Sequence, residues 1–345
     1  MSSWSPLLSL LLNVLVTGTL ASMVAGWVWL VVQLKNHRPF LPPLVVREVP
    51  WGFRTVLASV LSWFGLQVVV LLVYGALTHR RRGVSLAFTE QMFLVTVVNS
   101  LELFVLPLLL RTVGRAQAAD LGLDLSRAGQ SARVGAVAFL IVTWPVNLLH
   151  GLCVLLWPVH QKHPLEEMVR GGLDLPTAYL ALLSAVVLAP AVEEILFRGI
   201  VQSWLSRVFR RWRLANVVQE TGLEWVDEPP AADLDQPSKA SGPASADWMP
   251  IVVTSAIFAL AHAPQWPAPV PIFVLSLVLG FIYQRTGSLL ASFVLHALFN
   301  GFSTLLLFWA IVNGGQQAAK AVPAPQSLAV PPAVLSADSA YPFVH

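Results

Sequence analysis

The chain has 345 residues, of which 56% are hydrophobic and only 11% are charged. A soluble globular protein carries about 25% charged residues, so too few polar side chains are present here to cover a soluble surface. The net charge of +3 requires no nucleic-acid partner, because Lys and Arg of membrane proteins gather in cytoplasmic loops. The single cysteine, Cys153, excludes an intramolecular disulfide and a cysteine-based metal cluster. The composition predicts an integral multi-pass membrane protein, in the plasma or inner membrane if the source is bacterial.

Eight segments are apolar enough to cross a bilayer, which takes about 20 residues. Four lie in an expected N-terminal membrane region, residues 1–174: Pro6–Leu34, Thr55–Leu77, Gln91–Leu110 and Val134 to about Val159. Four lie in an expected catalytic core, residues 175–313: Leu175 to about Arg198, two spans within Trp248–Gln284 that four prolines separate, and Leu289 to about Val312. We therefore predict an all-α helical bundle with about eight transmembrane helices.

Three further segments have a different character. Residues 214–247 are acidic and rich in Pro, Ala and Ser, and residues 314–345 are rich in Ala, Pro and Gln. Both contain too little apolar surface to fold, so we expect a disordered insertion and a disordered tail. The apolar spacing in Ile200–Trp212 favours a helix in the headgroup layer or a continuation of the fifth span.

The distribution of Lys and Arg predicts the orientation of the spans. The loops after spans one, three, five and seven hold 15 of these residues, and the remaining segments hold 6. Basic loops stay on the cytoplasmic side. We expect these four loops in the cytoplasm and both termini outside.

The fifth span ends with three charged side chains, Glu193, Glu194 and Arg198. Charges inside a span are costly and indicate function by default. Arg198 is close enough in helical spacing to pair with one acid, but the two acids point about 100° apart, so the second needs another partner. An ion pair that marks the end of the span is the structural alternative.

Two later spans carry His262, His296 and Asn300. His296 and Asn300 are four residues apart and face the same side of a helix. Hydrogen bonds between helices are the structural alternative for each residue. However, the predicted topology brings the polar groups of all three spans to the cytoplasmic half of the bilayer. We therefore predict that they share one water-containing pocket, as a hydrolytic site requires.

Two mechanisms fit these residues. In the first, Glu193, His262 and His296 bind Zn²⁺ or another divalent metal, and Glu194 acts as a base or orients a ligand. In the second, Glu193 deprotonates a water held by His262, while His296 and Asn300 donate to the oxyanion. The spacing does not choose between them. The chain has no HExxH motif, and it lacks the GxSG-type serine and GxGD aspartate motifs.

The ordered set Glu193-Glu194-x-x-x-Arg198, Phe258-x-x-x-His262 and His296-x-x-x-Asn300 resembles the CPBP family of CAAX-protease and bacteriocin-processing intramembrane endopeptidases. The resemblance covers roughly Leu175–Leu307. It implies that Glu193 and His262 activate a water, and that His296 and Asn300 stabilise the tetrahedral intermediate or help to bind metal. It also implies that Glu194 and Arg198 support them. The substrate would be a prenylated CAAX-like protein or another membrane-associated protein or peptide.

Two other classes of protein remain open from the residues. A transporter would use the intramembrane acids to bind a cation or relay protons, although the chain shows no repeated half. A catalytically silent scaffold or immunity protein would keep the motifs for packing. Further polar pairs, Asn147 with His150 and Asn99 with Glu102, are expected to hold helices together.

Overall fold

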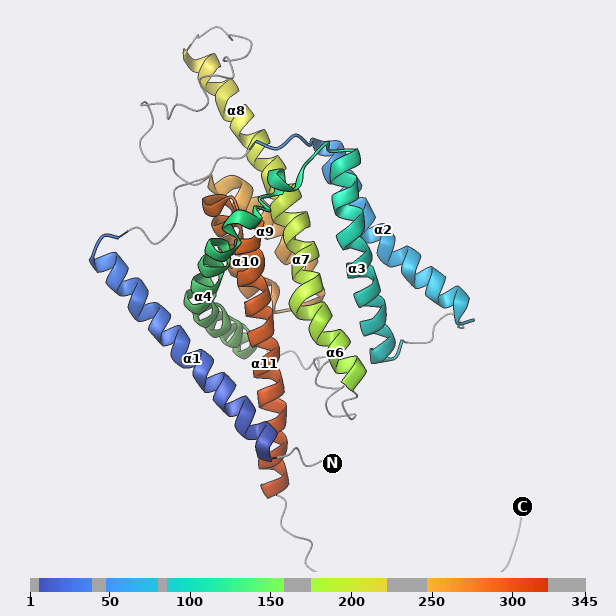
Figure 1. The fold of residues 1–345 in the computed structure, drawn as a ribbon, viewed down its shortest axis with the longest axis vertical. Coiled ribbons are helices and arrows are strands. Elements are labelled where there is room, and N and C mark those ends of the chain that lie inside the picture. The colour runs from blue at the N-terminus through green and yellow to red at the C-terminus, as the bar shows by residue number, and fades with distance from the viewer. Residues whose placement is uncertain (1–5, 39–47, 80–85, 158–174, 222–246, 322–345) are drawn as a thin grey trace, which may run out of the picture.

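The computed structural model describes residues 6–38, 48–79, 86–157, 175–221 and 247–321 (Figure 1). Within these ranges the chain forms helices and turns, without strands. The α-helices are α1 (Pro6–Lys35), α2 (Phe53–Leu77), α3 (Phe88–Thr112), α4 (Ala128–Leu156), α6 (Leu175–Leu183), α7 (Ala189–Glu193), α8 (Ser203–Thr221), α9 (Trp248–Ala261), α10 (Pro269–Thr286) and α11 (Leu289–Ala321). Two π-helical segments are η3 (Ser184–Leu188) and η4 (Glu194–Gln202), and short 3₁₀ turns are η1 (Ala118–Leu121), η2 (Leu125–Arg127) and η5 (Ala263–Gln265).

The predicted polytopic helical bundle is confirmed. Seven helices in the described part of the chain are long and apolar enough to cross a membrane, and α9 is a shorter apolar helix. The prolines separate α9 from α10, as the sequence predicts. With 14 residues, α9 rises about 21 Å, which is less than the roughly 30 Å of a hydrocarbon core. Alone, α9 is therefore too short to cross the hydrocarbon core.

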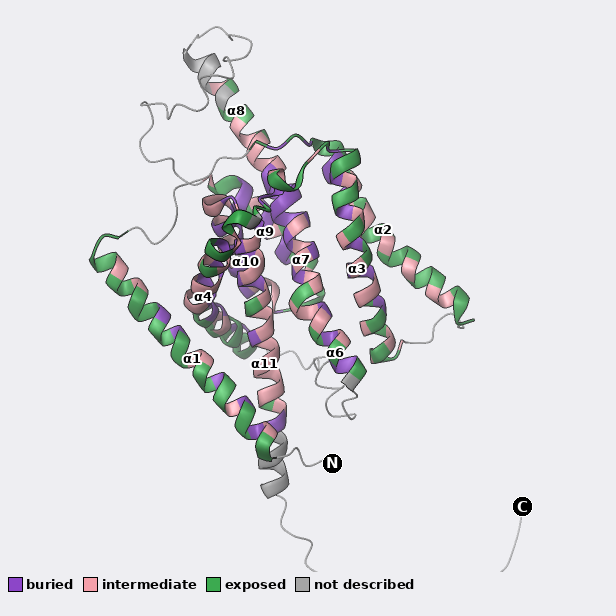
Figure 2. Cartoon of the chain, in the orientation of Figure 1, coloured by how far each residue is buried: buried purple, intermediate pink, exposed green. Residues whose placement is uncertain are grey.

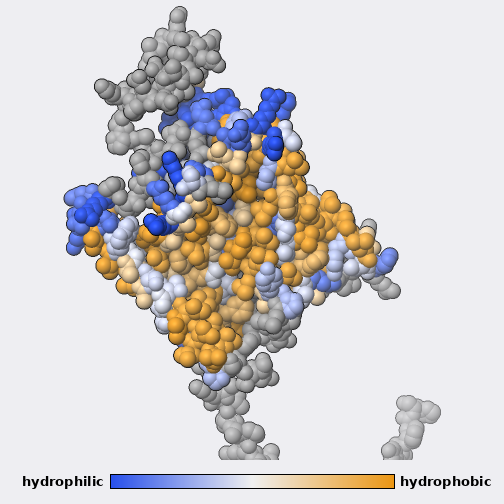
Figure 3. Space-filling model, in the orientation of Figure 1, coloured by the Kyte–Doolittle hydropathy of each residue, from blue (hydrophilic) through white to orange (hydrophobic). Residues whose placement is uncertain are grey.

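Figure 1 shows α1 and α2 on opposite flanks of the bundle, with the remaining helices between them. Most residues on these two flanking helices are exposed, while buried residues gather in the centre (Figure 2). The exposed residues on α1 and α2 are mainly aliphatic or aromatic, and hydrophobic residues form a broad band across this face of the molecule (Figure 3). A surface of this kind suits contact with lipid.

One long helix carries the first motif. It runs from α6 through η3, α7 and η4 into α8, and Pro176–Arg213 contains a stretch that is apolar enough to cross a membrane. Ile200–Trp212 therefore continues the fifth helix past Arg198, which is one of the two possibilities that the sequence left open. A contact between helices accompanies this continuation: Gln202 is buried and donates from Nε2 to the Gly280 carbonyl of α10 at 2.9 Å, so this polar side chain stays inside the bundle.

The predicted starts of the two expected disordered segments need correction. Helix α8 continues to Thr221 and α11 continues to Ala321, so residues 214–221 and 314–321 are helical. The first prolines of these segments are Pro229 and Pro323, and nothing in the sequence before them prevents a helix. Residues 222–246 and 322–345 lie outside the described residues. The fourth span also begins earlier than predicted, at Ala128.

Close packing of α4 against α11 supports the region that carries the third motif. A Cβ added at Gly135 would lie 2.5 Å from the Ala291 carbonyl oxygen, so only glycine fits at this crossing. Small residues let membrane helices approach in this way. This contact fixes the position of α11, which contributes His296 and Asn300.

Candidate active site

The first motif is organised around a fully buried ion pair. Nη1 of Arg198 lies 3.2 Å from Oε1 of Glu194, and neither side chain is exposed. Arg198 also donates from Nη2 to the Ser276 hydroxyl of α10 at 2.9 Å. Its guanidinium carbon lies 4.5 Å from the centre of the Phe258 ring of α9. Arg198 therefore connects three helices and neutralises Glu194.

Glu194 also contacts the third motif. Nδ1 of His296 lies 2.8 Å from Oε1 of Glu194, and both side chains are buried. Because the Glu194 carboxylate is paired with Arg198, it accepts this hydrogen bond and Nδ1 carries the proton. The other ring nitrogen of His296 is thereby left to face the rest of the site.

Glu193 occupies a different environment from its neighbour. Its side chain is 19% exposed, and its Oε2 lies 3.6 Å from Nε2 of His296, which is too long for a direct hydrogen bond. The two adjacent acids therefore differ in environment. Glu194 is buried in an ion pair with Arg198, whereas Glu193 is partly exposed and lies beside Nε2 of His296.

The ring of Phe258 connects the second motif to the other two. Its centre lies 4.9 Å from the ring of Phe197, 4.8 Å from that of His262 and 6.0 Å from that of His296. With the Arg198 contact, Phe258 touches residues of all three motifs. Phe258 belongs to the second motif but had no predicted role, and Ser276 was not among the predicted site residues.

His262 caps the C-terminus of α9 and is partly buried. Its Nδ1 lies 2.8 Å from the carbonyl oxygen of Phe258. A carbonyl only accepts, so Nδ1 carries the proton and Nε2 is an acceptor. His262 is therefore fixed in one tautomer, with a ring nitrogen able to hold a water.

Asn300 makes a contact between helices. Its Nδ2 donates to the carbonyl oxygen of Ala185 in η3 at 3.0 Å. One of its two amide protons is thus engaged with the backbone of the helix that carries Glu193. The predicted role in binding the oxyanion would fall to the second proton.

The residues predicted to bind a metal are Glu193, His262 and His296. In the described part of the chain, no group of three or more His, Cys, Asp or Glu side chains is arranged to hold an ion. Both nitrogens of His296 face carboxylates, and Nδ1 of His262 faces a carbonyl. These side chains do not form a metal site as they stand, so the chemistry below is derived without a metal.

The weaker polar pairs connect helices or bond within one helix. Glu102 accepts a hydrogen bond from Ser62 of α2 at 3.2 Å, and Asn99 donates to Ser184 of η3 at 3.2 Å. Asn147 donates to the Thr143 carbonyl of its own helix at 2.9 Å.

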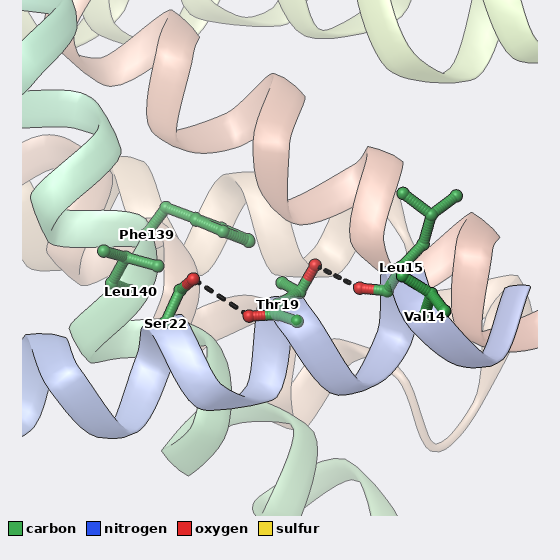
Figure 4. A pocket seen from close by; sticks show the side chains of 7 residues that line it. Val14, Leu15, Thr19, Ser22, Phe139 and Leu140 are labelled. Atoms are coloured by element: carbon green, nitrogen blue, oxygen red, sulfur yellow. Dashed lines mark hydrogen bonds between the residues drawn. The ribbon is translucent and has the colours of Figure 1, made fainter. Parts of the chain in front are cut away.

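A groove of about 440 Å³ lies between α1 and α4, and none of the predicted site residues lines it. Its lining is Val14, Leu15, Gly18, Thr19, Ser22, Phe139 and Leu140. The Thr19 and Ser22 hydroxyls donate to carbonyls of their own helix (Figure 4). The groove therefore offers no polar side chain for catalysis.

The fold and site together define a multi-pass membrane protein with a central cluster of carboxylates and imidazoles. Residues 175–222 and 236–302 match the model of the family described as Rce1-like, Type II CAAX prenyl endopeptidase Rce1-like. This match covers about a third of the chain and confirms the resemblance that the three motifs predict. No curated protein and no solved structure matches the chain.

Proposed function

We propose that this protein is an intramembrane endopeptidase in which Glu193 activates a water to hydrolyse a peptide bond. The observation that carries this proposal is the contrast between the two adjacent acids. Glu194 is fully buried and paired with Arg198, whereas Glu193 is partly exposed and lies beside His296. An accessible carboxylate next to two imidazoles suits general-base catalysis.

Unpaired polar atoms support the presence of water beside Glu194 and Arg198. Oε2 of Glu194 and Nε of Arg198 are buried and have no hydrogen-bond partner among the described residues. Buried polar groups normally have a partner, and ordered water supplies it where protein does not.

In the proposed reaction, Nε2 of His262 accepts a hydrogen bond from the water and Glu193 removes its other proton. The resulting hydroxide forms a bond to the carbonyl carbon of the peptide. In this scheme His296 carries a proton on both ring nitrogens, so Nε2 of His296 and the second amide proton of Asn300 both donate to the oxyanion that develops. The carbon–nitrogen bond then breaks, and Glu193 returns its proton to the leaving amine.

Glu194 and Arg198 would support the reaction without touching the substrate. Glu194 fixes the ring of His296 through Nδ1, in the manner of the acid in a catalytic triad. Arg198 compensates the charge of Glu194 and packs on Phe258, which in turn holds His262.

The proposed substrate is a prenylated CAAX-like protein or another membrane-associated protein. The family description supports this substrate class. The motifs lie on helices of membrane-spanning length, which supports a substrate that reaches the site from the bilayer. An endopeptidase of this kind needs no nucleic-acid partner.

Substitution of Glu193→Gln tests the proposal. The purified variant is reconstituted in liposomes, and cleavage of a farnesylated CAAX peptide is compared with cleavage of the same peptide without the lipid. We expect cleavage by Glu193→Gln to fall at least about 100-fold, because general-base catalysis contributes roughly 10²–10⁴-fold. Glu48→Gln is the matched control, since Glu48 is exposed and pairs with Arg210 at the surface.

The outcomes separate the competing classes of protein. If Glu193→Gln cleaves as fast as the unchanged protein, the proposed mechanism is wrong. If the unchanged protein cleaves neither peptide, the endopeptidase assignment fails. If it cleaves both peptides equally, the enzyme stands and the prenyl group is not part of its specificity.

A further inference from the structure

The helix that carries Glu193 contains a backbone irregularity one turn before the motif. The N–H of Ala189 donates to the carbonyl of Ser184, five residues back, which is the π-helical pattern. In the same pattern the carbonyl of Ala185 would accept from the N–H of residue 190, but Pro190 has no N–H. The N–H of residue 189 is used by Ser184, and residue 190 has none to offer to Ala185.

Asn300 of α11 supplies the missing donor. Its Nδ2 lies 3.0 Å from the Ala185 oxygen, so a neighbouring helix donates to the carbonyl that lacks a donor within the π-helical segment. Buried carbonyl groups require such a partner. The irregular backbone is thus tied to the helix that also provides His296.

A second asparagine holds the adjacent residue. Asn99 of α3 is buried, and its Nδ2 donates to the Ser184 hydroxyl at 3.2 Å. Ser184 and Ala185 are consecutive, so asparagines from two different helices bind the same turn of η3. The segment Ser184–Leu188 is therefore held by α3 and by α11.

This turn determines where the two acids point. A π-helical turn adds one residue to the helix, which rotates everything after it by about 100° relative to an uninterrupted α-helix. In the observed register, Glu194 reaches both Arg198 and His296, while Glu193 remains partly exposed. A return to regular α-helical geometry in η3 would turn both carboxylates away from His296, whereas Arg198 lies on the same helix and would turn with them.

We propose that Asn99 is a positioning residue, which acts with Asn300 to hold the π-helical turn in the register that presents Glu193 to the substrate. This inference rests on the proposed function for its catalytic consequence. The role of Asn99 in holding the turn itself rests only on the hydrogen bonds at Ser184 and Ala185.

Variants that remove the Asn99–Ser184 bond test the inference. Asn99→Ala, Ser184→Ala and the double variant are compared in the liposome peptide assay. We expect each to lower kcat about threefold to tenfold with KM unchanged, because the bond orients the base without contacting substrate. The double variant should be no slower than the slower single variant, since both remove one interaction. Asn147→Ala is the matched control, because its amide bonds within its own helix.

A second readout keeps the inference testable apart from catalysis. Hydrogen–deuterium exchange of backbone amides within residues 184–194 should be faster in Asn99→Ala and Ser184→Ala than in the unchanged protein or Asn147→Ala. If the unchanged protein lacks peptidase activity, the proposed function fails while this exchange measurement still tests the turn.

Three results would overturn the inference: unchanged kcat with unchanged exchange, effects that add in the double variant, or a change confined to KM. If Asn99→Ala fails to fold, Ser184→Ala decides alone, because it deletes a single oxygen atom and leaves Asn99 in place.

Discussion

Nδ1 of His296 donates to Oε1 of Glu194 across 2.8 Å, which joins residues 102 positions apart in the chain. The same carboxylate oxygen lies 3.2 Å from Arg198. One atom thus links the first motif to the third and balances the charge within the first. Glu194 is therefore expected to matter for stability, and Glu193 for the reaction.

Substitution of Glu194→Gln should destabilise the protein by about 3 kcal/mol, because it leaves the buried guanidinium of Arg198 without a countercharge. Glu193→Gln should cost less than about 1 kcal/mol, since that side chain is partly exposed. The free energy of unfolding is measured by denaturant titration in mixed micelles. Equal losses for the two variants would contradict the distinction. The double variant Glu194→Leu/Arg198→Met should recover much of the stability, without activity.

Arg198→Lys should lower the free energy of unfolding by about 2 kcal/mol, although the charge is kept. A lysine has neither the planar face that packs on Phe258 nor the geometry to reach Glu194 and Ser276 together. Arg210→Lys is the control, because its pair with Glu48 lies at the surface and should be worth less than about 0.5 kcal/mol. A loss at position 198 no larger than at position 210 would show that charge alone matters.

Pro190→Ala should stabilise the helix by about 1 kcal/mol while lowering the peptidase rate at least about tenfold. The new N–H lies five residues after Ala185, so it extends the π-helical pattern and competes with Asn300 for the Ala185 carbonyl, which releases Asn300 from its position in the site. Thermal unfolding and the liposome assay are measured on the same preparation. A variant that is more stable and fully active would mean that the hydrogen bond from Asn300 to Ala185 is not needed for catalysis.

Gly135→Ala should destabilise the protein by about 1–3 kcal/mol, because its methyl group would lie 2.5 Å from the Ala291 oxygen. Gly129→Ala in the same helix has open space around its Cβ and should be neutral or stabilising by up to about 1 kcal/mol. Both free energies are measured by the same titration. Similar effects at the two positions would contradict the close α4–α11 packing.

Excess chelator should leave the peptidase activity unchanged, since the proposed mechanism uses Glu193 and His262 without a metal. Activity is measured after dialysis against chelator and again after Zn²⁺ is added back, and metal content is determined on the same samples. Loss of activity on chelation with recovery on Zn²⁺ addition would favour the metal alternative. Loss of the bound ion in His262→Ala would then assign a ligand.

The amino-acid sequence by itself was sufficient for the membrane bundle, for the separation of α9 from α10 and for the family resemblance. Long apolar runs can be buried only in a bilayer, and the cluster of four prolines between α9 and α10 is too dense for one continuous helix, whereas the single Pro107 and Pro145 are accommodated inside α3 and α4. The three motifs also identified the helices that meet at the candidate site, because polar groups inside spans are rare.

Only the tertiary structure decided which acid pairs with Arg198, how far the fifth helix continues and what Asn300 binds. Helical spacing placed both acids within reach of Arg198, but which of them is buried depends on His296, from a helix about 100 residues later. Likewise, the helix continues past Arg198, and there Gln202 donates to the Gly280 carbonyl in α10. Hydrogen bonds between distant segments have no signature in local sequence, since their partners are brought together only when the helices pack.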